Sequence, residues 1–167
     1  MSLTTNDDAL RRVKLLSLDV DGVLTDGGIY YADDGNTYRK FNAKDGMGMV
    51  RLMNTGVQVT IISAGRPGGI EHRANRLGIK HVFTDVHDKL SVLRKLCEDL
   101  GIGMEDVAHI GDDVNDLAIM EHIGLSITVA DAVDDVLDVA DIVTRRQGGA
   151  GAVREICDAI IRLQATP

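Results

Sequence analysis

The sequence predicts an α/β protein built on a doubly wound, mostly parallel β-sheet. Short apolar runs alternate with helical patterns along most of the chain, and most of these runs are too apolar to have a face in water. Glycines at 56, 78 and 101 each follow an apolar periodic stretch, as they do at helix C-termini. Such alternation is typical of βαβ units, whose helices cover both faces of a parallel sheet.

The first predicted strand, at 13–20, reads VKLLSLDV, and a second aspartate follows it directly. A hairpin insertion is expected at about 28–41, where β-prone runs flank the turn signal Asp-Asp-Gly-Asn. The remaining predicted strands are short apolar runs at 57–63, 81–85, 107–112, 124–129 and 141–144. Helical patterns are found at 46–54, 69–77, 87–100, 114–122, 132–138 and 150–163.

No repeat, low-complexity tract or proline-rich linker divides the chain. We therefore expect a single domain over residues 1–167, with the hairpin as its one insertion and no cap domain. Cys97 and Cys157 each lie inside an amphipathic helical pattern, which predicts small core residues rather than a disulfide or a zinc site.

The charge of the chain excludes several classes of partner. Eighteen Lys and Arg against 26 Asp and Glu give a formal net charge of −8, which repels phosphate backbones and anionic lipids. Aromatic residues make up only 3%, which argues against a stacking platform for single-stranded nucleic acid. No membrane span or signal peptide is recognisable. We expect a cytoplasmic protein that binds neither nucleic acid nor membranes.

Polar residues gather where the predicted strands end, which is where ligands bind in open parallel sheets. In chain order these residues are Asp19, Asp21, Ser63, Lys89, Asp112, Asp113 and Asp116. Several carboxylates at one rim repel one another, and a divalent cation is the simplest way to keep them ionised. Ligands that are all hard oxygens favour Mg²⁺, which commonly also binds substrate phosphate. The pattern therefore predicts a phosphate ester as substrate.

The residue types also predict how the phosphoryl group is transferred. Asp19 is the candidate nucleophile, and Asp21 is the candidate acid and base because Gly22 permits a turn after the strand. Ser63 is expected to donate to a phosphoryl oxygen, and Lys89 to neutralise its charge. Each piece alone would also fit a surface turn, a helix cap or a solvated helix residue. Their combination in this order is what indicates a catalytic site.

These residues lie in segments that resemble the four motifs of the haloacid dehalogenase superfamily of phosphatases: DVDGVLT (19–25), Ser63, Lys89 and GDDVND (111–116). Longer segments resemble its capless branch, which includes phosphatases of 3-deoxy-D-manno-octulosonate 8-phosphate (KDO 8-phosphate). They are DVDGVLTDGGIYY, FNAKDGMGM, RANRLGI, HIGDDVNDLAIM and TRRQGGAGAVREICD. The resemblance covers nearly the whole chain. It implies Mg²⁺-dependent hydrolysis of a sugar-acid phosphate, foremost KDO 8-phosphate in lipopolysaccharide precursor synthesis, through an aspartyl phosphate on Asp19.

The resemblance also implies which groups bind metal and substrate. Asp19 and Asp112 would bind Mg²⁺ through their side chains and Asp21 through its backbone carbonyl, with Asp113 and Asp116 behind them. The substrate-binding residues that we expect are Asp21, Asn42, Ala43, Lys44, Asp45, Gly46, Arg66, Arg73 and Lys89. Members of this branch are typically homotetramers whose hairpins assemble into a barrel. The hairpin here carries all three tyrosines of the chain, which fits a subunit contact.

One departure from the family pattern bears on the substrate. The family usually has Thr or Ser followed directly by Gly-Arg after the second strand, whereas this chain has Ser63-Ala64-Gly65-Arg66. A phosphatase acting on a nine-carbon sialic-acid-type 9-phosphate is therefore an alternative. The segment GGAGAVRE (148–155) fits either a flexible helix entry or a tail that approaches a neighbouring active site. From other classes, the alternatives are a phospho-acceptor receiver domain and a catalytically silent oligomerising or regulatory relative.

Overall fold

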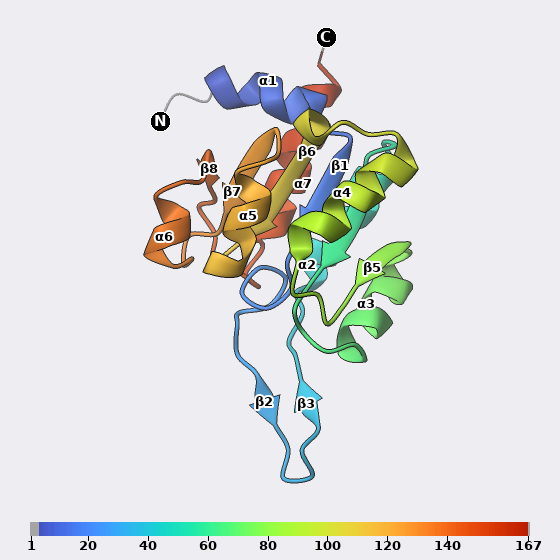
Figure 1. The fold of residues 1–167 in the computed structure, drawn as a ribbon, viewed down its shortest axis with the longest axis vertical. Coiled ribbons are helices and arrows are strands. Elements are labelled where there is room, and N and C mark those ends of the chain that lie inside the picture. The colour runs from blue at the N-terminus through green and yellow to red at the C-terminus, as the bar shows by residue number, and fades with distance from the viewer. Residues whose placement is uncertain (1–3, 167) are drawn as a thin grey trace.

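The centre of the fold is a six-stranded sheet in the order β5-β4-β1-β6-β7-β8, in which every neighbouring pair is parallel (Figure 1). The computed structural model describes residues 4–166, so residues 1–3 and 167 of the predicted domain lie outside the described part. The strands are β1 (Leu15–Leu18), β4 (Gln58–Ile62), β5 (His81–Phe83), β6 (Val107–Gly111), β7 (Leu125–Thr128) and β8 (Ile142–Val143). The predicted fold class and all six predicted strands are confirmed, and each strand is shorter than predicted.

The helices cover both faces of this sheet. In Figure 1, α4 and α5 lie in front of the strands and α2 and α7 behind them. The α-helices are α1 (Thr4–Arg12), α2 (Ala43–Met53), α3 (Gly69–Leu77), α4 (Lys89–Leu100), α5 (Leu117–Met120), α6 (Asp134–Leu137) and α7 (Ala152–Gln164). Two 3₁₀ turns, η1 (Met104–Asp106) and η2 (Val114–Asp116), complete the set. Among residues 4–166, no helix is both long and apolar enough to cross a membrane.

Two predicted helices were drawn too long, and one helix was not predicted. The pattern at 114–122 is the turn η2 followed by the single turn α5, and the pattern at 132–138 is reduced to α6. No periodic pattern predicts α1, because Ala9 and Leu10 are the only apolar side chains between its first residue and Arg12. Leu10 is nevertheless buried, in the core that α7 also lines.

Side chains point alternately to the two faces of the sheet, so the interior is divided into two hydrophobic cores. From β1, Leu16 and Leu18 belong to the larger core, which includes residues of α2 and α7. Leu15 points the opposite way, into a smaller core with Leu93 of α4 and Ile119 of α5. Successive side chains of a strand face opposite sides of a sheet, so a strand buried on both faces is mostly apolar, and Ser17 is the one polar residue of β1. Cys97 and Cys157 are both buried and unpaired, as predicted.

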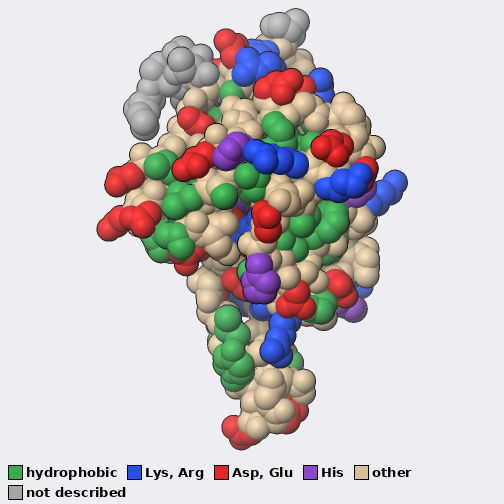
Figure 2. Space-filling view, in the orientation of Figure 1, with side chains coloured by type: hydrophobic (Ala, Val, Ile, Leu, Met, Phe, Trp, Pro, Cys, Tyr) green, Lys and Arg blue, Asp and Glu red, His purple; other side chains and the backbone are tan. Residues whose placement is uncertain are grey.

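The hairpin projects from the body of the molecule as an antiparallel pair, β2 (Tyr30–Tyr31) and β3 (Thr37–Tyr38) (Figure 1). Its turn is closed by the Ala32 amide, which donates to the carbonyl of Asn36. Ile29, Tyr30, Tyr31 and Tyr38 are all exposed, and Tyr31 reaches 75%. Figure 2 shows apolar side chains along this projection.

The strand order fixes where a site can form. β1 lies between β4 and β6, so the chain leaves the centre of the sheet in one direction through β4 and in the other through β6. Ligands of doubly wound sheets bind at this switch, beyond the carboxyl ends of the strands. Asp19, Ser63 and Asp112 are the first residues after β1, β4 and β6.

Candidate active site

A cavity of about 270 Å³ opens at this switch point. It is lined by Asp19, Asp21, Ser63, Ala64, Gly65, Asp112, Asp113, Val114 and Asn115. Five of these residues were predicted for the site from the sequence. The structure thus brings together groups from three strand ends, the outer two of which, Asp19 and Asp112, are 93 residues apart in the chain.

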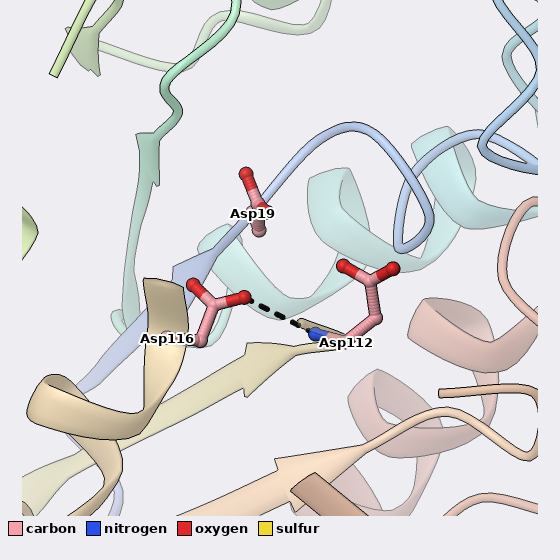
Figure 3. A group of neighbouring side chains, drawn as sticks. All are labelled: Asp19, Asp112 and Asp116. Atoms are coloured by element: carbon pink, nitrogen blue, oxygen red, sulfur yellow. Dashed lines mark hydrogen bonds between the residues drawn. The ribbon is translucent and has the colours of Figure 1, made fainter. Parts of the chain in front are cut away.

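Three carboxylates meet beside the cavity. One oxygen from each of Asp19, Asp112 and Asp116 lies within 4.8 Å of the others, and Figure 3 shows their side chains around a common centre. Asp112 Oδ1 is buried without a hydrogen-bond partner. The carboxylate of Asp112 packs directly against Gly22, which has φ +91°. A Cβ at this position would overlap that carboxylate. Hard oxygens with one unpaired buried atom fit a divalent cation such as Mg²⁺.

Lys89 lies inside the carboxylate cluster. It is the first residue of α4, and its side chain is only 1% exposed. Its Nζ atom lies 3.0 Å from Asp19 Oδ2 and 2.7 Å from Asp116 Oδ1. Buried ammonium and carboxylate groups are tolerated only when they are paired in this way. The interpretation of Lys89 as a solvated helix residue is therefore wrong.

The carboxylates differ in how readily they ionise. Burial, together with the nearby carboxylates of Asp19 and Asp116, raises the pKa of Asp112 to about 7. Burial and the charge of Asp116 also raise the pKa of Asp19, although Lys89 opposes this rise. Burial alone would raise the pKa of Asp116, but His109 and Lys89 lower it to about 2. Two of the three carboxylates thus resist ionisation, a conflict that a bound cation relieves.

Asp116 has a supporting partner that the sequence did not reveal. His109 Nε2 lies 3.0 Å from Asp116 Oδ1, and His109 Nδ1 lies 3.0 Å from Ser17 Oγ. The other oxygen of Asp116 accepts a hydrogen bond from the Asp112 amide at 3.2 Å, drawn as the dashed line in Figure 3. His109 and Ser17 each lie in the middle of an apolar run that predicts a strand. A single polar residue in such a run does not indicate a functional role.

Asp21 also has an unpredicted partner, Arg39, which follows β3 of the hairpin. Arg39 Nε donates to Asp21 Oδ1 at 2.7 Å, and Arg39 Nη2 donates to Oδ2 at 3.1 Å. The Arg39 side chain is 8% exposed. Gly65 makes room for it, because a Cβ at Gly65 would approach Arg39 Nη2 to 2.9 Å. The hairpin is thereby tied to the candidate acid and base.

Ser63 is buried at the cavity wall, and its Oγ atom accepts a hydrogen bond from the Gly65 amide at 3.0 Å. A hydroxyl that accepts in this way still has its own proton to donate. Arg66 is exposed, and it is not among the residues that line the cavity. Arg39, rather than Arg66, packs between this loop and Asp21. Contact of Arg66 with substrate stays a prediction.

The segment Asn42–Gly46 begins α2 and lies outside the cavity lining. Asn42 caps this helix by accepting from the Lys44 amide. Asp45 is buried, and its Oδ1 atom accepts from the Arg154 amide of α7 at 2.8 Å. Arg73 is half-buried and donates to the Asn42 carbonyl at 3.4 Å. Ala43 and Lys44 are exposed. In this chain, Asp45 therefore serves first to join α2 to α7.

The glycine-rich segment before α7 packs against the loop that follows Asp21 in the same chain. The Gly149 amide donates to the Val23 carbonyl at 3.0 Å, and Asn42 Nδ2 donates to the Gly149 carbonyl at 3.0 Å. A Cβ at Gly148 would overlap the Gly22 carbonyl. The segment therefore packs on the active-site loop of its own chain, and its approach to a neighbouring active site stays a prediction.

Comparisons with known proteins agree with this geometry. A family model described as haloacid dehalogenase-like hydrolase matches residues 81–156. The 3-deoxy-D-manno-octulosonate 8-phosphate phosphatase of Yersinia pestis is 44% identical over 161 residues, which cover 95% of this chain and 86% of the relative. The Escherichia coli K12 phosphatase of the same name is 43% identical over 152 residues, covering 91% and 81%.

A solved structure of similar fold contains ligands. The 3-deoxy-D-manno-octulosonate 8-phosphate phosphatase of Moraxella catarrhalis, in complex with magnesium, phosphate and KDO, superposes with a TM-score of 0.95 at 35% identity. The match covers 98% of this chain and 94% of that one.

Proposed function

Because the chain belongs to the haloacid dehalogenase-like hydrolases, we propose that it is a Mg²⁺-dependent phosphatase that hydrolyses KDO 8-phosphate to KDO and phosphate. The observation that carries this proposal is the convergence of Asp19, Ser63 and Asp112 at the switch point, with Lys89 paired to Asp19. The identity of 44% to a phosphatase of that name supports the choice of sugar acid.

In the first half-reaction, a carboxylate oxygen of Asp19 attacks phosphorus and the bond from phosphorus to the sugar oxygen breaks. Both oxygens of Asp19 are held in place, since the Val20 amide donates to Oδ1 at 2.7 Å and Lys89 contacts Oδ2. Such fixed geometry is what makes an attack at short range productive. Ser63 donates to a phosphoryl oxygen. Asp21, which takes up a proton from water once Arg39 releases one of its oxygens, gives that proton to the leaving sugar oxygen.

In the second half-reaction, Asp21 takes a proton from water, and the resulting hydroxide attacks the phosphorus of the aspartyl phosphate. The bond between phosphorus and Asp19 breaks, and phosphate leaves with Asp19 restored as a carboxylate. Arg39 holds both oxygens of Asp21 in the free enzyme. A proton transfer by Asp21 therefore requires Arg39 to release at least one oxygen, and we propose that an anionic group of the substrate attracts it.

Asp19 and Asp112 are the side chains that would hold Mg²⁺, with the Asp21 carbonyl as a third ligand. Bound Mg²⁺ would supply positive charge against the oxygens of the transferring phosphoryl group. We assign Asp116 a supporting position, because Lys89, His109 and the Asp112 amide already engage its two oxygens. Asp113 is exposed and accepts from the Val114 amide, so we place it outside the ligand set.

We also propose that four copies assemble through the hairpin. The exposed side chains of Ile29, Tyr30, Tyr31 and Tyr38 support this, since an apolar two-stranded projection is marginal on its own. The two unpaired buried cysteines are compatible with the cytoplasmic location that we propose.

The test is a panel of phosphate esters presented to purified protein with Mg²⁺, with released phosphate as the readout. We expect kcat/KM for KDO 8-phosphate to exceed that for glucose 6-phosphate and for N-acetylneuraminate 9-phosphate by at least about 100-fold, or about 2.7 kcal/mol. A preference for the nine-carbon substrate would replace the proposed sugar acid. Absence of any Mg²⁺-dependent activity that Asp19→Asn abolishes would support a catalytically silent protein.

A further inference from the structure

A fully buried chain of polar groups lies beneath the carboxylate cluster. It leads from Ser17 on β1 through His109 on β6 to Asp116, and from there through Lys89 to Asp19. Ser17, His109 and Asp116 are all 0% exposed. Buried polar side chains cost stability unless they are hydrogen-bonded. The presence of this chain of polar groups within an otherwise apolar strand pair therefore calls for an explanation.

The two central strands hold this chain of polar groups in place. Ser17 and His109 are directly opposite each other in the parallel register of β1 and β6, at the centre of the sheet. Asp116, in contrast, ends the short turn η2, which offers little support of its own. The contact from His109 thus anchors a carboxylate on a turn to the two most central strands.

The hydrogen-bond chemistry assigns the role of one ring nitrogen of His109. Asp116 Oδ1 can only accept while it is ionised, so Nε2 must carry the proton that it donates. Nδ1 lies 3.0 Å from Ser17 Oγ, a hydroxyl that can donate or accept, so this contact orients the ring in either case. The same Asp116 oxygen also accepts from Lys89 at 2.7 Å. The imidazole therefore sets the direction in which Asp116 presents this oxygen to Lys89.

We propose that His109, oriented by Ser17, is a positioning residue that acts through Asp116 to hold Lys89 against Asp19. This inference rests on the proposed phosphatase function and gives a role to a residue that the sequence pattern did not assign to the site. Partners of this kind, one step behind the reacting groups, commonly change activity about 10–100-fold when they are removed. The effect should fall on kcat, because His109 does not line the cavity in which the substrate would bind.

The decisive comparison is between two amides. In His109→Gln the amide nitrogen takes about the place of Nε2 and can still donate to Asp116. In His109→Asn the shorter side chain takes the place of Nδ1, next to Ser17, and cannot reach. We expect His109→Asn and His109→Leu to lower kcat about 10–100-fold with KM changed less than about twofold, and His109→Gln to recover most of the loss.

Ser17→Ala is the milder variant, expected to lower kcat in the same sense but by less. Thr60→Val is the control, since Thr60 is buried on the neighbouring strand β4 and its hydroxyl donates to the His81 carbonyl, away from Asp116. Equal losses in His109→Gln and His109→Asn, or losses confined to KM, would overturn the proposal. So would a kcat loss in Thr60→Val as large as that in Ser17→Ala.

A crystal structure of the Ser17→Ala and His109→Leu variants gives a readout that does not depend on turnover. The proposal expects Lys89 Nζ to leave its position 3.0 Å from Asp19 Oδ2 in His109→Leu. An unchanged Lys89 contact would refute the positioning role. Wild-type protein that releases no phosphate would instead refute the proposed function, and the position of Lys89 would still decide the present inference.

Discussion

Replacement of Lys89 by methionine should destabilise the protein severely at neutral pH. The change removes one cation and leaves the buried carboxylates of Asp19 and Asp116, whose side chains are 8% and 0% exposed, without their partner. At an effective dielectric constant of about 20, each contact of about 3 Å amounts to about 5–6 kcal/mol. Relief of the desolvation of Lys89 offsets much of this, and breaking a buried pair from one side costs about 3–5 kcal/mol net.

The assay is urea unfolding of metal-free protein at pH 8, at one fixed protein concentration. With a slope of about 2 kcal/mol per molar urea, the expected loss shifts the midpoint downward by about 1.5–2.5 M. Lys95→Met is the matched control on the same helix, because Lys95 forms an exposed pair with Asp99. That change should cost less than about 0.5 kcal/mol.

The pH dependence makes this prediction sharper. Without Lys89, the pKa values of Asp19 and Asp116 in the folded variant should both rise above their unfolded values. The folded variant then regains stability as pH falls and these carboxyl groups take up protons. The difference from wild type should therefore shrink between pH 8 and pH 5. A Lys89→Met variant within about 1 kcal/mol of wild type at pH 8, or a deficit that is the same at pH 5, would refute the reasoning.

Other predictions address the metal, the loop and the hairpin. Since burial raises the pKa of Asp112 to about 7, this group stabilises the metal-free protein below about pH 4 and loses that effect as pH rises through about 7. Mg²⁺ should therefore raise Tm more at pH 8 than at pH 5, and equal shifts in a thermal scan would count against the site. Gly22→Ala should cost about 1–3 kcal/mol and weaken activation by Mg²⁺, because its Cβ would overlap Asp112. Gly56→Ala, at φ +98° with open space around it, controls for backbone strain and should leave Mg²⁺ activation unchanged. Tyr30→Ser combined with Tyr38→Ser should reduce the mass measured by light scattering without loss of helical circular dichroism, and an unchanged mass would exclude the hairpin as the interface.

The layered fold could be predicted because local patterns carry it. The apolar runs of β1, β4, β6 and β7 are almost wholly buried, whereas the edge strands β5 and β8 are only partly buried. Periodic stretches such as 69–77 are helices with the predicted bounds. The helix α1 was not predicted because it packs on the larger core mainly through one buried apolar side chain, Leu10. A single apolar residue makes no periodic pattern. The helix at 114–122 was predicted too long because its first residues form the 3₁₀ turn η2, which places Asp116 in the interior.

The carboxylates could be predicted because the carboxyl ends of parallel strands converge, so Asp19 and Asp112 had to lie near each other. The residues that support them could not. Arg39 reaches Asp21 only because of the path that the hairpin takes back to the sheet, and His109 reaches Asp116 only through the register of β6. Asp45, whose contact with substrate stays a prediction, accepts a hydrogen bond from the Arg154 amide of α7, 109 residues further along the chain. Each of these contacts depends on tertiary packing rather than on spacing.

The most direct test of the account is capture of the phosphorylated enzyme. Asp21→Asn slows formation of the intermediate, because it removes the acid for the leaving oxygen, although the amide can still donate a hydrogen bond there. It also removes the base that activates water and leaves Asp19 in place, so hydrolysis of the intermediate should become slower still. With KDO 8-phosphate labelled in its phosphoryl group and Mg²⁺ present, acid-quenched Asp21→Asn protein should carry label that hydroxylamine removes and that peptide mapping assigns to Asp19. Phosphate release by the wild type, with no label on either protein at any quench time, would contradict a covalent intermediate on Asp19.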